Sequence, residues 1–179
     1  MTKDIVRSGK PTTLLFEETK SSKEEMASIV KKIGKDIKGI TINMRGTSWG
    51  IYIVMNHKIL DIQNTQWDQH WIKIDFQNKE SRKNISFYNI YALAHYRVKE
   101  QCWNSLALKL DWNGGRFAIL GFDLNLVMNN EEKRGSIYLH DPSRAKHQNL
   151  IVDHNFMDIK QRNDKFTWRN RWLRAKNIK

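Results

Sequence analysis

Leu120-Gly121-Phe122-Asp123-Leu124-Asn125 is the stretch of the sequence that decides the fold. It closes a strand-like apolar run, Arg116 to Leu120, with a glycine followed by an aspartate and an asparagine. Residues at i and i+2 of an extended chain face the same side, so Asp123 and Asn125 are predicted to converge on one site. The aspartate there can orient an attacking water, and the asparagine can hold a phosphate oxygen without adding charge. Taken alone, the pattern also fits a polar turn after a strand.

A second strand-like run, Thr12 to Phe16, is followed directly by Glu17-Glu18. A carboxylate at the carboxyl end of a buried strand is held rigidly at a sheet edge, where α/β active sites tend to lie. Magnesium takes hard oxygen ligands, usually one or two carboxylates together with water and substrate phosphate. Either glutamate can supply such a ligand. The alternative is a pair of acids at a helix start, stabilised by the helix dipole.

The rest of the chain alternates short strand-like runs with a few helical patterns, which is typical of an α/β or α+β domain. A capping box at Ser22-Lys23-Glu24-Glu25 predicts a helix that ends near Gly34. Apolar residues of the run from His70 to Phe76 largely alternate with Lys73 and Asp75, which predicts a sheet with one wet face. The other predicted helices are Arg97–Leu110 and Ser143–His154, and the other predicted strands are Ile37–Asn43, Trp49–Met55, Lys58–Ile62, Ile85–Tyr91 and Phe166–Trp168.

The composition fits one folded domain with a basic surface. The chain has 179 residues, of which 40% are hydrophobic, enough for a single core. Lys and Arg number 31 against 19 acidic residues, giving a formal charge of +12 and a pI near 9.8. A polyanionic partner such as DNA suits this charge, because each neutralised phosphate releases counterions. Solubility alone is the alternative interpretation.

Cysteine content and hydropathy bear on where the protein works. The single cysteine, Cys102, excludes an internal disulfide and favours a reducing compartment. The first residues lack the apolar run of a signal peptide, and no segment approaches the ~20 apolar residues that a membrane helix needs. We therefore expect an intracellular protein of the nucleus or cytoplasm that is neither secreted nor embedded in a membrane. Its oligomeric state stays open.

Several segments, taken in order, resemble the endonuclease/exonuclease/phosphatase (DNase I-like) superfamily. Lys10 to Lys20 resembles the family's K-P-D-I-L-x-L-Q-E-T-K block, which implies that Glu18 is the metal ligand and that Glu17 replaces a glutamine. The segment from Asn89 to Ala92 is similar to N-V-Y-A-P, which implies that Tyr91 lies at the catalytic centre. The segment from Gly121 to Asn125 resembles G-G-D-F-N, which implies that Asp123 and Asn125 position the water and the scissile phosphate.

Three further segments resemble the endonuclease domain of plant LINE-type (non-LTR) retrotransposons. They are Glu131-Glu132-Lys133-Arg134-Gly135, Phe156-Met157-Asp158-Ile159 and Phe166-Thr167-Trp168-Arg169-Asn170. The resemblance implies a phosphodiesterase that hydrolyses DNA with Mg²⁺ (or Mn²⁺). It also implies a four-layer α/β/β/α sandwich, here incomplete, with residues 1–179 forming a single domain.

The sequence departs from the family's pattern at several places. The family's opening W-N motif has no match, and neither has its closing S-D-H motif, so we expect a domain that lacks both and the two strands that carry them. Val152-Asp153-His154 is a poor substitute, because it precedes Thr167-Trp168 and falls within a predicted helix. Leu93 replaces the proline after the tyrosine block, Ala94 replaces a polar residue, and Phe122 replaces a glycine. Impaired catalysis is therefore expected.

The sequence is compatible with two main functions. The first is a metal-dependent endonuclease. The second is a non-catalytic remnant that still binds nucleic acid, using the basic residues Arg169, Arg171, Arg174 and Lys176 near Trp168 and Trp172 for backbone contacts and stacking. A solvated terminus is the alternative interpretation of those residues. A protein-interaction module is a third possibility, supported only by the prospect of exposed apolar surface.

Overall fold

The computed structural model describes residues 9–19, 21–43, 50–92, 95–110, 117–129, 132 and 141–159. It divides into two compact units. The first, here called the sheet unit, comprises Met1–Ala92 and Leu108–Leu124. The second, here called the helical unit, comprises Leu93–Ala107 and Asn125–Lys179.

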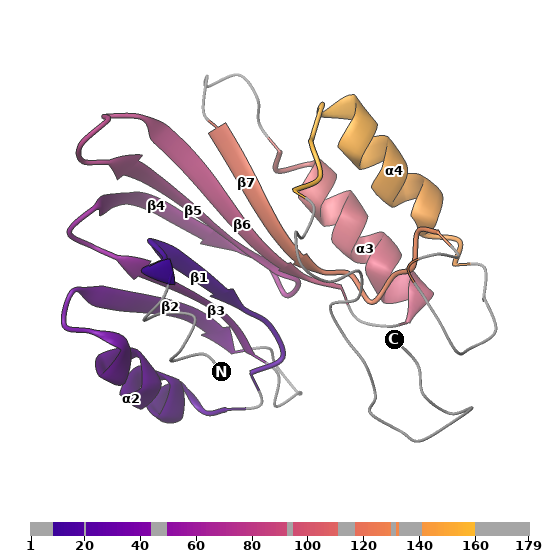
Figure 1. Ribbon diagram of the computed structural model, residues 1–179. Coiled ribbons are helices and arrows are strands. Elements are labelled where there is room, and N and C mark those ends of the chain that lie inside the picture. Colours follow the sequence, from indigo (N-terminus) through magenta and orange to yellow (C-terminus); the bar gives the residue numbers. More distant parts are fainter. Residues whose placement is uncertain are drawn as a thin grey trace. The chain divides into compact units, whose positions relative to one another are not determined.

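The first sheet of the sheet unit is antiparallel and has the strand order β1-β3-β2. Its strands are β1 (Thr13–Phe16), β2 (Ile37–Asn43) and β3 (Gly50–Asn56). Helix α2 (Lys23–Ile33) lies beside it (Figure 1), and Met26 and Val30 of α2 form a buried cluster with Tyr52 and Val54 of β3. The predicted capping box is present: the Ser22 hydroxyl accepts from the Glu25 amide at 3.1 Å, and the Glu25 carboxylate accepts from the Ser22 amide at 2.8 Å.

The second sheet has the strand order β4-β5-β6-β7 (Figure 1). Its strands are β4 (Leu60–Trp67), β5 (Trp71–Asn78), β6 (Asn84–Tyr91) and β7 (Phe117–Asp123). Strands β4, β5 and β6 pair antiparallel, and β7 runs parallel to β6. Because β6 and β7 are parallel, their carboxyl ends meet at the same edge of the sheet. Tyr91 and Asp123 are register partners at that edge.

Two features let the sheets approach each other closely. The Asn89 carboxamide on β6 is fully buried and donates to the carbonyl oxygens of Phe16 at 3.1 Å and Tyr52 at 2.9 Å, so one side chain of the second sheet is hydrogen-bonded to two strands of the first. Gly121 on β7 faces Leu15 on β1, and a Cβ atom at Gly121 would lie 2.1 Å from the Leu15 Cδ1. The glycine is therefore required by this close approach.

The prediction that the strand from His70 to Phe76 has one wet face is wrong. Every residue of β5 from Trp71 to Phe76 is buried. The alternating charges are accommodated because the Lys73 ammonium lies 3.3 Å from an Asp75 carboxylate oxygen, and the same oxygen accepts from the Ser86 hydroxyl at 2.6 Å. Paired and hydrogen-bonded charges can be buried where isolated ones cannot.

The helical unit contains α3 (Tyr96–Ala107) and α4 (Arg144–Asp153), which pack against each other. The Trp103 ring of α3 lies 5.0 Å from the His147 ring of α4, centroid to centroid. An ion pair between Lys146 and Glu100, at 2.5 Å, also joins the two helices. Among the helices that the structure describes, none is long and apolar enough to cross a membrane.

Most predicted elements are found, with changes at their ends. The largest change concerns the predicted strand Lys58–Ile62, which becomes β4 (Leu60–Trp67). Residues 57–59 form a turn instead, in which the Asn56 side chain accepts from the Lys58 amide at 3.0 Å. Strand β7 continues beyond the predicted Leu120 because its pairing with β6 extends to Asp123. The predicted strand Phe166–Trp168 lies outside the described residues.

Candidate active site

Glu18 and Tyr91 meet at one edge of the sheet unit. Tyr91 ends β6, and its hydroxyl donates a hydrogen bond to Oε1 of Glu18, two residues after the end of β1. The backbone of Glu18 has a φ of 50°, in the left-handed region that non-glycine residues rarely adopt. Thr19 fixes the chain just after it, because both its amide and its hydroxyl donate to the Gly50 carbonyl at 3.3 Å. Backbone outliers of this kind cluster at functional sites.

Glu17 and Asp123 add negative charge at the same edge. Asp123 is the register partner of Tyr91, and its carbonyl accepts from the Ala92 amide at 2.9 Å. Burial and, to a smaller extent, the negative charge of Asp123 raise the pKa of Glu17 from 4.5 to about 7, although a backbone hydrogen bond at Glu17 partly offsets them. The structure therefore brings Glu17, Glu18, Tyr91 and Asp123 together, whereas their catalytic roles stay predictions.

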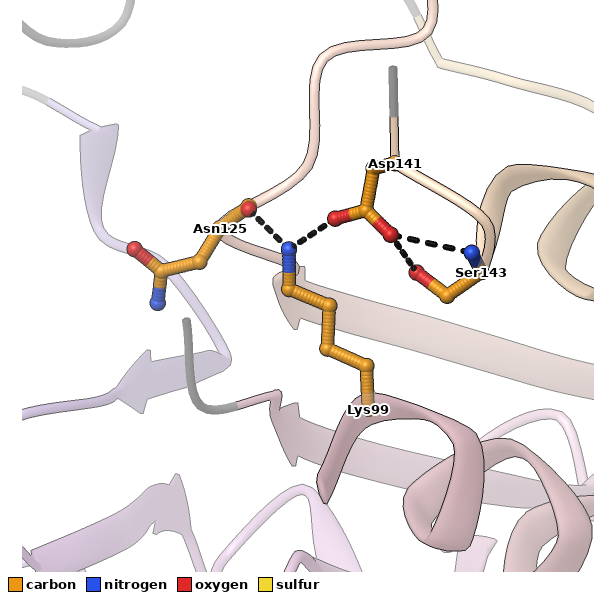
Figure 2. Close-up of polar contacts among 4 residues, drawn as sticks. All are labelled: Lys99, Asn125, Asp141 and Ser143. Carbon is orange, nitrogen blue, oxygen red and sulfur yellow. Dashed lines mark hydrogen bonds and ion pairs between the residues drawn. The ribbon is translucent and has the colours of Figure 1, made fainter. Parts of the chain in front are cut away.

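Asn125 belongs to the helical unit. Its backbone is not the extended chain from which we predicted that it faces the same side as Asp123. Strand β7 ends at Asp123, and Asn125 has a φ of 45°, so the rule that residues at i and i+2 face the same side does not carry over to it. Its carbonyl oxygen accepts a hydrogen bond from the ammonium of Lys99 on α3 at 2.5 Å. The position of the Asn125 main chain is thus set by residues of the helical unit (Figure 2).

Lys99 lies at the centre of a polar cluster that the sequence analysis missed. The Lys99 cluster comprises Lys99, Asn125, Asp141 and Ser143 (Figure 2). Burial alone would raise the pKa of Asp141, but hydrogen bonds from Lys99 and from the Ser143 hydroxyl and amide, with the Lys99 charge, lower it overall. Asp141-Pro142-Ser143 before a helix was the available signal, because aspartate commonly accepts from the backbone two residues on. Nothing in the spacing identified Lys99 as its partner.

His70 is a second buried polar residue that the sequence analysis did not single out. It precedes β5 with only 3% of its surface exposed, and its carbonyl accepts from the Tyr91 amide at 2.9 Å. Neither ring nitrogen has a hydrogen-bond partner. Burial lowers the pKa of His70, although the nearby charge of Asp68 opposes the effect. Burial therefore favours the neutral form of this imidazole, which lies beside the edge that carries Tyr91.

The acidic residues at this edge fit a cation that takes few protein ligands. Glu17, Glu18 and Asp123 supply hard oxygen atoms, and burial together with the charge of Asp123 raises the pKa of Glu17. Within the described residues, no group of three or more His, Cys, Asp or Glu side chains is arranged to hold a metal ion. A zinc site would need three or four such ligands. Magnesium needs only one or two carboxylates, with water and phosphate completing its shell.

Several predicted residues lie outside the part of the chain that the structure describes. They are Arg169, Arg171, Arg174 and Lys176, with Trp168 and Trp172, and all of Glu131-Glu132-Lys133-Arg134-Gly135 except Glu132. Val152-Asp153-His154 is described: its first two residues end α4, as the sequence predicted, and His154 follows the helix.

Comparison with solved structures identifies the fold. The chain is similar to the human Nocturnin catalytic domain, with 11% identity and a TM-score of 0.59, over 69% of this chain and 54% of that chain. It is similar to an endonuclease/exonuclease/phosphatase family protein from Bacteroides thetaiotaomicron, with 14% identity and a TM-score of 0.58, over 69% of this chain and 53% of that chain. It is also similar to ANGEL2, a 2′,3′-cyclic phosphatase, with 12% identity and a TM-score of 0.56, over 74% of this chain and 47% of that chain.

These likenesses confirm the predicted fold class, a mixed α/β fold of the DNase I-like type with two sheets. The chain spans about half the length of each of the three structures. No protein-family model matches it, and no curated protein matches it significantly.

Proposed function

We propose that this chain is a phosphodiesterase-type domain of the endonuclease/exonuclease/phosphatase superfamily that acts on DNA with Mg²⁺ or Mn²⁺. The observation that carries the proposal is the hydrogen bond from Tyr91 to Glu18, which joins the ends of two strands from different sheets. Glu17 and Asp123 lie close enough to interact electrostatically at the same edge. The similar structures support the proposal by their fold, and ANGEL2 among them is a phosphatase.

In this proposal each side chain at the edge has one task. Glu18 would hold the cation, and Tyr91 fixes the orientation of the Glu18 carboxylate through its hydroxyl. Asp123 orients the attacking water and accepts its proton. The Asn125 carboxamide donates to a phosphate oxygen. A bound divalent cation would polarise the phosphoryl group and offset the charge that develops on its oxygens.

DNA is the proposed substrate because of the charge of the chain and its resemblance to LINE-type endonucleases. A formal charge of +12 favours a polyanion. Descent from a retrotransposon endonuclease is part of the proposal, and it is supported by the sequence segments alone. The basic residues from Arg169 to Lys176 are proposed to contact the DNA backbone.

We further propose that these 179 residues cleave DNA slowly. The sequence has no Ser-Asp-His motif, whose histidine in the family assists at the reacting phosphate, and Val152-Asp153-His154 belongs to α4 and the residue after it. General acid–base assistance typically contributes ~10²–10⁴-fold in rate. A non-catalytic protein that binds nucleic acid is the second candidate, favoured by the same positive charge.

A nicking assay on supercoiled plasmid separates the two candidates. The wild-type chain is compared with Glu18→Ala, Asp123→Ala and, as a matched control, Glu80→Ala in the exposed turn between β5 and β6. Metal-dependent nicking that is lost in the first two variants and kept in the third supports the enzyme. Salt-sensitive DNA binding without nicking supports the binding protein. If the wild-type chain neither nicks the plasmid nor binds DNA, both proposals are wrong.

A further inference from the structure

Basic side chains collect at the end of the sheet unit that lies opposite the candidate active site. Three connections meet there: residues 34–38 lead from α2 into β2, residues 57–59 join β3 to β4, and residues 79–83 join β5 to β6 (Figure 1). The acidic residues of these connections are Asp36 and Glu80. The same connections carry six exposed cationic side chains, here called the basic end: Lys35, Lys38, Lys58, Lys79, Arg82 and Lys83.

Strand β6 separates the basic end from the candidate active site. Lys83 directly precedes β6 (Asn84–Tyr91), and Tyr91 ends it. A strand rises about 3.4 Å per residue, so the two ends of β6 lie about 24 Å apart. Carboxylates gather at the Tyr91 end and cations at the Lys83 end, so the sheet unit carries opposite charges at its two ends. A phosphate bound at Glu18 therefore lies too far away to touch the basic end.

Hydrogen bonds between the three connections hold the basic end in a fixed arrangement. The His57 amide donates to the Asp36 carbonyl oxygen at 3.0 Å, which ties the turn after β3 to the segment before β2. The Lys79 amide donates to the Ile59 carbonyl oxygen at 2.8 Å, and the Lys79 ammonium donates to the His57 carbonyl oxygen at 2.8 Å. The cations of the three connections are therefore presented together on one preorganised surface.

Local interactions leave most of this charge uncompensated. Lys31 and Lys32 in the last turn of α2 stabilise the helix dipole, and they are not part of the basic end. The Lys58 ammonium lies 3.1 Å from an Asp36 carboxylate oxygen, yet 63% of the Lys58 side chain remains exposed. Within the described residues, no other side chain of the basic end forms an ion pair. The basic end is therefore a concentrated positive surface that is open to a polyanion.

We propose that the basic end is a second nucleic-acid surface, which binds the phosphate backbone of duplex DNA without sequence preference. Cations on neighbouring connections displace counterions from the duplex, and this release drives binding. Contacts to the backbone carry no sequence information. The choice of DNA as the polyanion rests on the proposed function, whereas the presence of a polyanion site at this end does not. The DNA segment bound here lies about 24 Å from Tyr91 and is separate from the segment proposed to be cleaved.

Fluorescence anisotropy with a labelled DNA duplex in EDTA tests this surface. EDTA removes divalent cations, so the carboxylates of the candidate active site repel DNA and do not contribute to binding. The double variant Lys35→Gln/Arg82→Gln removes two charges from the basic end. As a matched control, Lys23→Gln/Lys109→Gln removes two exposed lysines at other places in the sheet unit, at the start of α2 and beside the middle of β6. The two variants therefore have the same net charge.

We expect Lys35→Gln/Arg82→Gln to raise the Kd about 10- to 60-fold at ~0.1 M salt, because each lost phosphate contact carries a salt slope of about 0.9. The slope of log Kd against log salt concentration should fall by about 1–2, and the control should keep the wild-type slope. The variant Lys35→Arg/Arg82→Lys, which keeps both charges, should bind like the wild type. Thermal unfolding checks that the variants fold, since exposed substitutions rarely prevent folding.

Nuclear magnetic resonance locates the bound DNA. Addition of the duplex in EDTA should shift the amide signals of residues 34–38, 57–59 and 79–83 and leave that of Glu18 unchanged. Equal weakening of binding in the two double variants, or signal shifts confined to other residues, would overturn the proposal. A wild-type chain that does not bind the duplex in EDTA would do the same. A wild type that binds the duplex through the basic end but does not nick plasmid with Mg²⁺ would refute the proposed cleavage and support this surface.

Discussion

Replacing Glu17 with glutamine should stabilise the protein, and the gain should grow with pH. Burial and the charge of Asp123 raise the pKa of Glu17 from 4.5 to about 7 in the folded state. Between these values the folded protein keeps a proton that the unfolded chain has lost, so the free energy of unfolding falls as the pH rises. The loss of stability caused by ionising Glu17 in the folded protein is nearly absent below pH 4.5 and complete above pH 7. Glutamine keeps the shape of the side chain and carries no charge.

The magnitude follows from the same pKa. One pKa unit corresponds to about 1.4 kcal/mol, so the rise in the Glu17 pKa from 4.5 to about 7 corresponds to about 3 kcal/mol of stability. Glu17 is only partly buried, and solvent screening reduces this to about 1–2 kcal/mol. We expect the free energy of unfolding of Glu17→Gln to exceed that of the wild type by about 1–2 kcal/mol at pH 8 and by well under 1 kcal/mol at pH 4.5.

Urea unfolding in EDTA, followed by tryptophan fluorescence at both pH values, measures the difference. Exposed Glu80 provides the control, since Glu80→Gln should shift stability by less than about 0.5 kcal/mol at either pH. A Glu17→Gln gain that is the same at pH 4.5 and pH 8, or a loss of stability at pH 8, would refute the placement of Glu17 beside Asp123.

Three further predictions concern packing and charge. Gly121→Ala should destabilise the protein by about 1–2 kcal/mol, because the new methyl group meets Leu15, and most of that loss should disappear in a Leu15→Ala background when both are measured by urea unfolding. Asn89→Ala should cost about 2–3 kcal/mol in the same assay, since it leaves one buried and one partly buried carbonyl oxygen without the donor that joins the sheets. Asp141→Asn should be less stable than the wild type at pH 6. Because the folded pKa of Asp141 lies below its usual value of 3.8, that difference should vanish as the pH falls through the folded pKa, as thermal unfolding from pH 6 downwards can show.

The elements that the sequence predicted well are those with a strong local signal. The capping box at Ser22 marks the start of α2 because its two hydrogen bonds involve residues three apart. Apolar runs located β1, β2 and β6 to within a residue or so. The edge that carries Glu18 and Asp123 was also predictable, because each acid directly follows or ends a strand-like run.

The features that the sequence did not reveal depend on contacts between distant residues. Lys73 and Asp75 alternate with apolar residues as solvent-facing residues do, and their mutual ion pair, with the hydrogen bond from Ser86 on β6, compensates both charges in the core. Gly121 was predicted to end a strand, whereas the strand passes through it and the absence of a side chain is required by Leu15 on another sheet. The pairing of Lys99 with Asp141 spans 42 residues and leaves no pattern in the sequence.

The central claim is that Glu18, Tyr91 and Asp123 surround one divalent-cation site. Mn²⁺ tests it directly, because this paramagnetic ion broadens the nuclear magnetic resonance signals of nearby residues. On titration with Mn²⁺, the signals of Tyr91 and Asp123 should broaden first in the wild type and should persist to at least tenfold higher Mn²⁺ in Glu18→Gln. Broadening that begins elsewhere in the chain, or that is the same in Glu18→Gln, would contradict the account.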